Sequence, residues 1–250
     1  MKYLSNYRFL VGAITILSGI LALLCMITGG MAVNYNFDAF SDPVLALNYS
    51  ANHQLVSWFL LLDMFGYYLL LLPLIFYLHQ QYKYRSPWTS LITFSGLAYV
   101  LIGAVGAAIL AAVWPDMMQE HLTATSEQKE MIGGLFKAIT LVVTKGMWNV
   151  IEMLFSAVWW IGIGKLLYRE SKVLGALTMT TGISTLLDAA GNITGFHSLA
   201  EAGLNIYLLL AIVWAIVMGI SIMRKTACSQ SVPAKTVSAS ALKNQLASLF

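Results

Sequence analysis

"LITFSGLAYVLIGAVGAAILAAVW", residues 91–114, contains no charged side chain. The hydrocarbon core of a bilayer is about 30 Å thick, and a helix of about 20 apolar residues can cross it. The uncharged run extends back to Trp88, and five other long apolar runs accompany it. They lack the alternating pattern of a membrane β-barrel. The sequence therefore predicts an all-α fold, a six-span transmembrane helical bundle within residues 1–225, with spans at 9–31, 56–79, 88–114, 139–167, 173–192 and 203–223.

The composition excludes an ordinary soluble domain. Of the 250 residues, 59% are hydrophobic and 10% are charged, whereas soluble domains carry about 25% charged residues. The formal net charge of +3 is a topology signal and implies no nucleic-acid partner. The lipid bilayer is the partner that the composition implies. Residues 226–250 are rich in Ser, Ala, Lys and Gln and predict a disordered cytoplasmic tail.

Basic residues gather in one set of the segments between the spans. Because Lys and Arg are enriched in cytoplasmic loops, this asymmetry predicts that both termini are cytoplasmic. The opposite set of segments contains Lys129 and Lys137 alone among the basic residues. The first span has no clear small-residue cleavage site after it and is expected to remain uncleaved. The residues of the basic set are Lys2, Arg8, Lys83, Arg85, Lys165, Arg169, Lys172, Arg224, Lys225, Lys235 and Lys243.

The stretch "VTKGMWNVIEMLF", residues 143–155, places polar side chains inside the fourth span. Lys145, Asn149 and Glu152 stand at i, i+4 and i+7, which is one face of an α-helix. Lys145 is expected at the depth of Asp63 in span two, and an ion pair between them would cost far less than two isolated charges. Two other readings stay open: Lys145 could snorkel to the interface, or the pair could only join helices. Glu152 is nearest the midplane and has no second cation nearby in sequence.

Together, the polar residues of spans two, four and five predict an outward-facing pocket. Ionisable residues within a bilayer are costly, so each indicates a functional site by default. A small polar or cationic ligand suits a site with three acids and one lysine. No metal-ligand spacing and no catalytic motif occurs, so neither a metal site nor a cofactor is expected. The predicted pocket consists of Asp63, Tyr67, Lys145, Asn149, Glu152, Asp188 and Asn192.

Three further local features predict how the helices bend, pack and meet the membrane surface. Pro73 is the mid-span proline of span two and is expected to kink that span below Asp63. Small residues spaced along 96–108 favour close helix packing in span three. Residues 115–137 have an amphipathic pattern and are expected to rest on the membrane surface.

Several motifs resemble a known bacterial membrane family, catalogued as domain of unknown function 4386. They are "YRFLVGAITILSGILALL" in span one, "FYLHQQYK" ending span two, and "FSAVWWIGIGKLLYRESKVLGALTMTTGISTLLD" across spans four and five. The resemblance implies six spans and a bacterial inner membrane, and it supplies no activity. Glu170 interrupts the family's basic turn, and Lys145 and Glu152 have no counterpart in its pattern. The matching positions are Trp159, Gly164, Leu167, Tyr168, Arg169, Leu174, Gly175, Asp188 and, in span two, Asp63.

Three functions are compatible with the sequence. The first is binding or transport of a small polar or cationic ligand, in which case a homo-oligomer is possible because six spans usually need a second copy to build an alternating-access path. The second is a structural or assembly protein whose polar residues only join helices. The third is an enzyme acting on a lipid, with Asp63 or Glu152 as general base.

Overall fold

A computed structural model describes residues 2–230, and these residues contain helices and no strand. Six of the helical stretches are long and apolar enough to cross a membrane, so the predicted all-α, multi-pass membrane fold is confirmed. They are Asn6–Ala32, Pro43–Tyr82, Thr89–Thr123, Ser126–Tyr168, Lys172–Thr194 and His197–Arg224. The predicted tail lies outside the described residues from position 231 onward. Residues 226–230, the first five of the predicted tail, belong instead to the last helix, which ends at Gln230. No Gly or Pro interrupts residues 220–230.

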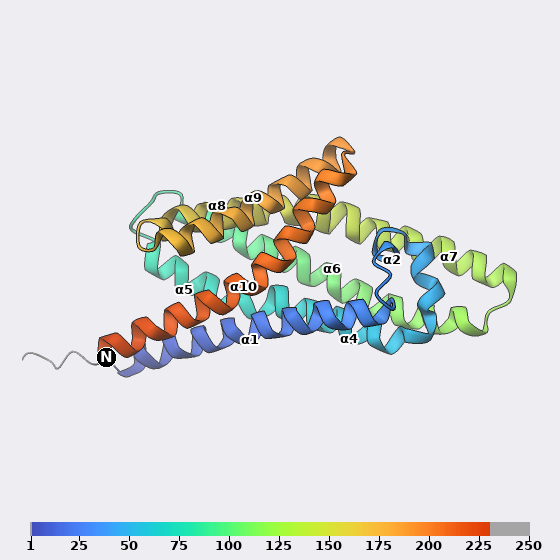
Figure 1. The fold of residues 1–250 in the computed structure, drawn as a ribbon, viewed down its shortest axis with the longest axis horizontal. Coiled ribbons are helices and arrows are strands. Elements are labelled where there is room, and N and C mark those ends of the chain that lie inside the picture. Colours follow the sequence, from blue (N-terminus) through green and yellow to red (C-terminus); the bar gives the residue numbers. More distant parts are fainter. Residues whose placement is uncertain (1, 231–250) are drawn as a thin grey trace, which may run out of the picture.

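Two of the six stretches contain segments with irregular winding. The regular helices around them are labelled in Figure 1. The elements η1 and η3 are 3₁₀ segments, whereas η2 and η4 are π-helical segments. In chain order they are α1 (Lys2–Ala32), α2 (Asp38–Ser41), α3 (Pro43–Ala46), η1 (Leu47–Asn52), α4 (His53–Asp63), η2 (Met64–Tyr68), η3 (Leu69–Leu71), α5 (Leu72–Tyr82), α6 (Thr89–Thr123), α7 (Ser126–Leu141), η4 (Val142–Glu152), α8 (Met153–Tyr168), α9 (Lys172–Thr194) and α10 (His197–Gln230).

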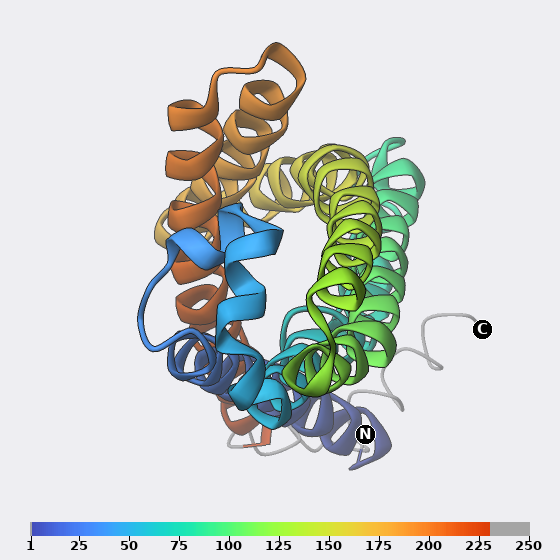
Figure 2. The ribbon, with the colours of Figure 1, turned by 90° about the vertical axis from the view of Figure 1, so that its right-hand side faces the viewer.

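The long helices form a closed ring in the order of the chain. Each span packs against the next one, from α1 and α4 through α6, α8 and α9 to α10. The ring closes because α10 also packs along α1 (Figures 1 and 2). Glycines permit this last contact: a Cβ on Gly219 would lie 2.6 Å from the carbonyl oxygen of Gly12. Small residues at such crossings let two helix backbones approach closely.

Aromatic side chains fill the centre of the ring. Trp159 stacks on Tyr99 with ring centroids 5.9 Å apart, and Trp160 meets Trp214 edge-on at 4.3 Å. The indole N–H of Trp214 donates a hydrogen bond to the hydroxyl of Thr178 at 2.7 Å. Such pairs add to the energy of burying their area. The rings therefore join spans three, four, five and six.

The small residues of α6 make room for these rings. Gly96 faces Trp159, Gly103 faces Tyr68, and a Cβ at either position would overlap the facing ring. The sequence predicts close packing along residues 96–108. The structure shows that the glycines accommodate aromatic side chains from neighbouring spans as well as bringing the helices together.

Residues 115–137 are divided between two helices, and no new helix begins at Pro115. Helix α6 continues through Pro115 to Thr123, and α7 begins directly afterwards with a capping box between Thr125 and Gln128. At about 1.5 Å per residue, the 35 residues of α6 reach roughly 50 Å, well beyond a bilayer core of about 30 Å. The two helices pack on each other, and Trp114 stacks on Phe136 at 5.1 Å.

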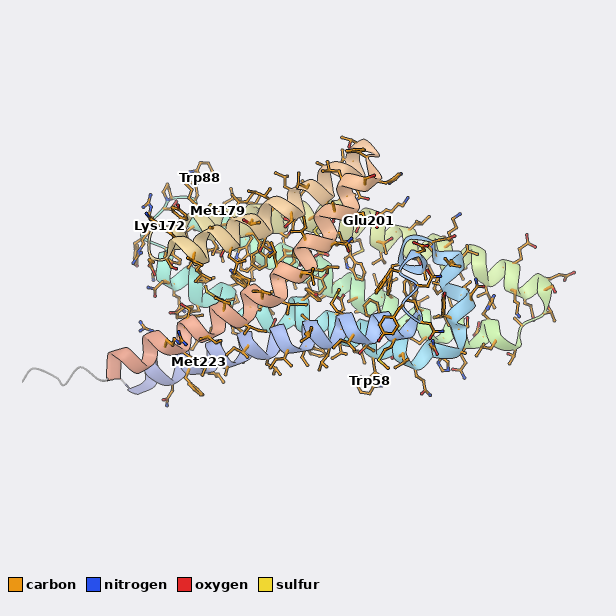
Figure 3. All side chains as sticks on the ribbon, in the orientation of Figure 1. Trp58, Trp88, Lys172, Met179, Glu201 and Met223 are labelled. Atoms are coloured by element: carbon orange, nitrogen blue, oxygen red, sulfur yellow. The ribbon has the colours of Figure 1, made fainter. Side chains whose placement is uncertain are left out.

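Charge divides the two ends of the bundle. Lys172 lies at the end that holds the N-terminus, and Glu201 lies toward the opposite end (Figure 3). At the basic end Arg85 donates to Glu170 at 2.6 Å and so links the turn after α5 to the turn after α8. Trp58 and Trp88 project outward toward opposite ends (Figure 3) and are 62% and 65% exposed. Exposed tryptophans at two levels are typical of the two membrane interfaces.

Candidate functional site

Three of the predicted site residues are buried in the interior of the ring. Asp63 ends α4, Glu152 ends η4 and Asp188 belongs to α9, and their exposed fractions are 9%, 0% and 1%. Glu152 interacts electrostatically with both Asp63 and Asp188. We call these three acids the carboxyl cluster. Spans two, four and five contribute one acid each.

The hydrogen bonds of the carboxyl cluster are incomplete. Tyr68 donates its hydroxyl to Oε2 of Glu152 at 3.2 Å, and the amide of Asn192 donates to Oδ1 of Asp188 at 2.7 Å. Within residues 2–230, Oδ2 of Asp63, Oε1 of Glu152 and Oδ2 of Asp188 have no hydrogen-bond partner. None of the three acids forms an ion pair with a described Lys or Arg. The cluster is therefore acidic, buried and uncompensated by any described cation.

A layer of tyrosines borders the cluster. The hydroxyl of Tyr99 lies 2.9 Å from that of Tyr207 and donates to the backbone carbonyl of Tyr67 at 2.9 Å. Tyr67 in turn donates to the carbonyl of Leu208 at 3.3 Å. Tyr68 packs edge-on against Tyr99 with centroids 5.7 Å apart. The layer therefore connects spans two, three and six beside the acids.

Of these tyrosines, the sequence identified Tyr67 as a site residue and missed Tyr68, Tyr99 and Tyr207. The adjacent pair Tyr67 and Tyr68 follows Asp63 by about one helical turn, which is the signal that was available for Tyr68. No equivalent signal marks Tyr99 or Tyr207, because each is a single tyrosine in a span without charges. Tyr99 and Tyr207 come together only through the packing of α6 and α10 in the ring.

Span two changes its winding directly after Asp63. The π segment η2 and the 3₁₀ segment η3 follow each other, and Pro73 stands at the start of α5, where its missing N–H is tolerated. Side chains of other spans use the carbonyls of this segment: Ser18 donates to Gly66 at 2.5 Å and Tyr99 to Tyr67 at 2.9 Å. The irregular winding occupies the region where the sequence predicts a kink.

Span four shows why the predicted ion pair does not form. Val142–Glu152 is a π-helical segment, with more residues per turn than an α-helix. Residues seven apart then no longer lie on one face. Glu152 faces the interior, whereas Lys145 is exposed and does not pair with Asp63 in the described part of the chain. Asn149 is half-buried, and within residues 2–230 its side chain makes no hydrogen bond to the three acids.

The structure contains a small void among the spans. Its volume is about 10 Å³, which is close to the space that one water molecule needs. Its walls come from spans one, two, three, four and six, and the three acids are not among them. The lining residues are Ser18, Gly19, Ala22, Gly66, Tyr67, Leu71, Tyr99, Trp160, Ala211, Trp214 and Ala215.

No group of three His, Cys, Asp or Glu side chains in residues 2–230 is arranged to hold a metal ion. Comparison of the chain with family models, with curated proteins and with solved structures finds no match. The function is therefore inferred from the geometry of the carboxyl cluster and its surroundings.

Proposed function

We propose that this multi-pass membrane protein binds a small cation at the carboxyl cluster and carries it between the two sides of the bilayer. The observation behind the proposal is that three buried acids share one interior region without a described cation. A buried charge that lacks a partner is expensive, and acids kept in such places mark ion or substrate pathways. A positively charged ligand would supply the missing partner.

The winding of spans two and four supports the same proposal. Asp63 directly precedes one π segment and Glu152 ends the other. π-helical turns occur frequently at functional sites, and broken helices at membrane depth place backbone carbonyls near bound cations in transporters. Both acids therefore stand where the helical hydrogen bonding is least regular.

A structural role is the second candidate, and one contact favours it. The hydrogen bond from Tyr68 to Glu152 joins spans two and four, as helix-joining polar residues do. The bond from Asn192 to Asp188 stays within α9, however, and contributes nothing to helix association. The unpartnered oxygens of all three acids fit a ligand site better than they fit a set of interhelical bonds.

The proposal includes the place of the protein in the cell. The resemblance to the bacterial family of unknown function supports a bacterial cytoplasmic membrane. The basic end, with Lys83, Arg85, Lys165, Arg169 and Lys172, supports cytoplasmic termini through the positive-inside rule.

Thermal unfolding of the purified protein in detergent tests the proposed cation binding. The melting temperature is measured against a panel of chloride salts of inorganic and small organic cations. At least one of them is expected to raise it, because a ligand that binds the folded state stabilises that state. Glu152→Gln should lose this rise. The matched control Glu201→Gln, at an exposed acid of α10, should keep it. Equal responses from Glu152→Gln and the wild type would contradict the proposal.

A further inference from the structure

We infer that the basic end of the bundle binds an anionic phospholipid, whose acyl chains lie on the outer face of α6 and α8 and whose headgroup meets the cations of two adjoining turns. The first turn is residues 82–88, which lead from α5 to α6, and the second is residues 165–172, which end α8 and begin α9. We call them the basic turns. The inference is independent of the proposed cation binding, because none of its residues belongs to the carboxyl cluster.

The basic turns carry a strong excess of positive charge. They contain five basic residues and one acid, Glu170, which gives them a net charge of +4. Arg85 donates to Glu170 at 2.6 Å, and this bond holds the two turns together. The other four cations are exposed and form no ion pair with a described acid. They are Lys83, Lys165, Arg169 and Lys172.

An apolar surface of α6 leads from the first basic turn into the membrane. Leu91, Phe94 and Leu101 are exposed and share one face of the helix, because they stand three and seven residues apart. The exposed ring of Trp88 ends this face at the basic turn. At about 1.5 Å per residue, residues 91–101 extend about 15 Å, which is half of a bilayer core of about 30 Å. The apolar face therefore matches the chain length of one leaflet.

Helix α8 widens this apolar surface and ends it with a cation. Helices α6 and α8 pack side by side, and the rings of Phe94 and Phe155 meet edge-on with centroids 6.0 Å apart. Val158 is exposed one turn after Phe155. Lys165 follows Val158 by seven residues, so it continues the same exposed face into the second basic turn. A lipid whose chains lie along α6 and α8 therefore has Lys165 near the level of its headgroup.

The combination of the two surfaces selects the chemistry of the occupant. Tryptophan prefers the headgroup level of a bilayer, and Trp88 and Lys172 lie at the same end of the bundle (Figure 3). Basic residues at this level attract anionic lipids, each by roughly fivefold in affinity. A zwitterionic phospholipid has no net charge to match the basic turns, and a free phosphate ion has no chains to cover the apolar face. A phospholipid with a net negative charge matches both.

Native mass spectrometry of the purified, full-length protein tests this site. The protein is released from micelles of an uncharged detergent that contain equal amounts of phosphatidylglycerol and phosphatidylcholine with identical acyl chains. Bound phosphatidylglycerol is expected to exceed bound phosphatidylcholine. The excess should fall as the ionic strength rises, because salt screens exposed charges. Inorganic phosphate, added as its ammonium salt at constant ionic strength, should not displace the lipid.

Paired variants assign the lipid to the basic turns. Lys165→Gln combined with Arg169→Gln removes two cations and should weaken phosphatidylglycerol binding about 30-fold, at roughly fivefold for each charge, without changing phosphatidylcholine binding. The matched control combines Lys129→Gln with Lys137→Gln, which removes the same charge from exposed positions of α7 and should bind as the wild type does. If the first protein fails to fold, Lys83→Gln, at an exposed turn position, takes its place and should lose about fivefold.

The contrary outcomes are distinct from one another. Equal binding of the two lipids would overturn the inference, because the apolar face would then accept any phospholipid. Displacement by inorganic phosphate would overturn it in favour of a site for free anions. Equal losses in the two double variants would show a dependence on total charge instead of on the basic turns. Failure of every cation in the melting assay would overturn the proposed function and leave the lipid site intact.

Discussion

At the residue scale, Tyr68 connects the packing of the core to the carboxyl cluster. Its hydroxyl donates to Glu152, and its ring fills the space that Gly103 leaves on α6. A side chain larger than hydrogen at Gly103 would overlap this ring. One methyl group can therefore disturb the hydrogen bond of an acid that lies on a different span.

Gly103→Ala tests this arrangement. Overpacking a tight core typically costs about 1–3 kcal/mol, so a clear fall in melting temperature is expected. Gly134→Ala is the control, because a Cβ there meets nothing within 4 Å and alanine favours the helix. The same unfolding assay serves for both. A Gly103→Ala protein as stable as the wild type would show that Tyr68 moves aside freely.

Individual acids could be predicted from the sequence, but their partners could not. Asp63, Glu152 and Asp188 stand out because charges are rare in apolar runs, and the structure brings them together. The pairing of Asp63 with Lys145 was predicted from their equal depth, together with an α-helical period that placed Lys145 on the same face as Glu152. The π winding of that segment turns Lys145 outward. No residue in the segment predicts π winding from the sequence.

At the element scale, the irregular part of span two is held by hydroxyls from other helices. A carbonyl that loses its helical partner within a bilayer must find another one. Ser18 of α1 donates to Gly66, and Tyr99 of α6 donates to Tyr67. Pro73 signals the irregularity in the sequence, whereas the identity of the donors depends on tertiary contacts.

Ser18→Ala should destabilise the protein by about 1 kcal/mol, because it leaves a buried carbonyl without its donor. The control is Thr28→Val on the same helix. The hydroxyl of Thr28 donates to Leu24 within α1, and because this bond is exposed its loss should have little effect. Unfolding in mixed micelles with increasing denaturing detergent measures both. Equal stability of Ser18→Ala and Thr28→Val would indicate that Gly66 finds another donor.

At the scale of the whole molecule, the apolar runs were sufficient to predict six spans. Length and continuity of apolar residues follow directly from the thickness of the bilayer. The order of the spans around the ring is a different matter, because it depends on contacts such as Gly12 with Gly219. The extent of α6 and α7 beyond the apolar core also follows from packing, since Trp114 and Phe136 bury each other.

The proposed orientation is tested with single cysteines. In a background with Cys25 and Cys228 replaced by alanine, Tyr84→Cys and Glu127→Cys mark the basic and the acidic end at exposed positions. A membrane-impermeant maleimide added to intact cells should label Glu127→Cys at once and Tyr84→Cys only after permeabilisation. The reverse pattern would place the termini outside.

The closed ring also has a consequence for the order in which the protein is inserted into the membrane. Spans are made in chain order, so Asp63 enters the membrane long before Glu152, Asp188 and the closing helix α10. That helix completes the ring along α1 and α9, and its Gly203 lies against the backbone of Asp188. Until α10 arrives, the nascent chain carries polar side chains toward lipid or the insertion machinery. A chain truncated before His197 therefore exposes acids that quality-control proteases can recognise.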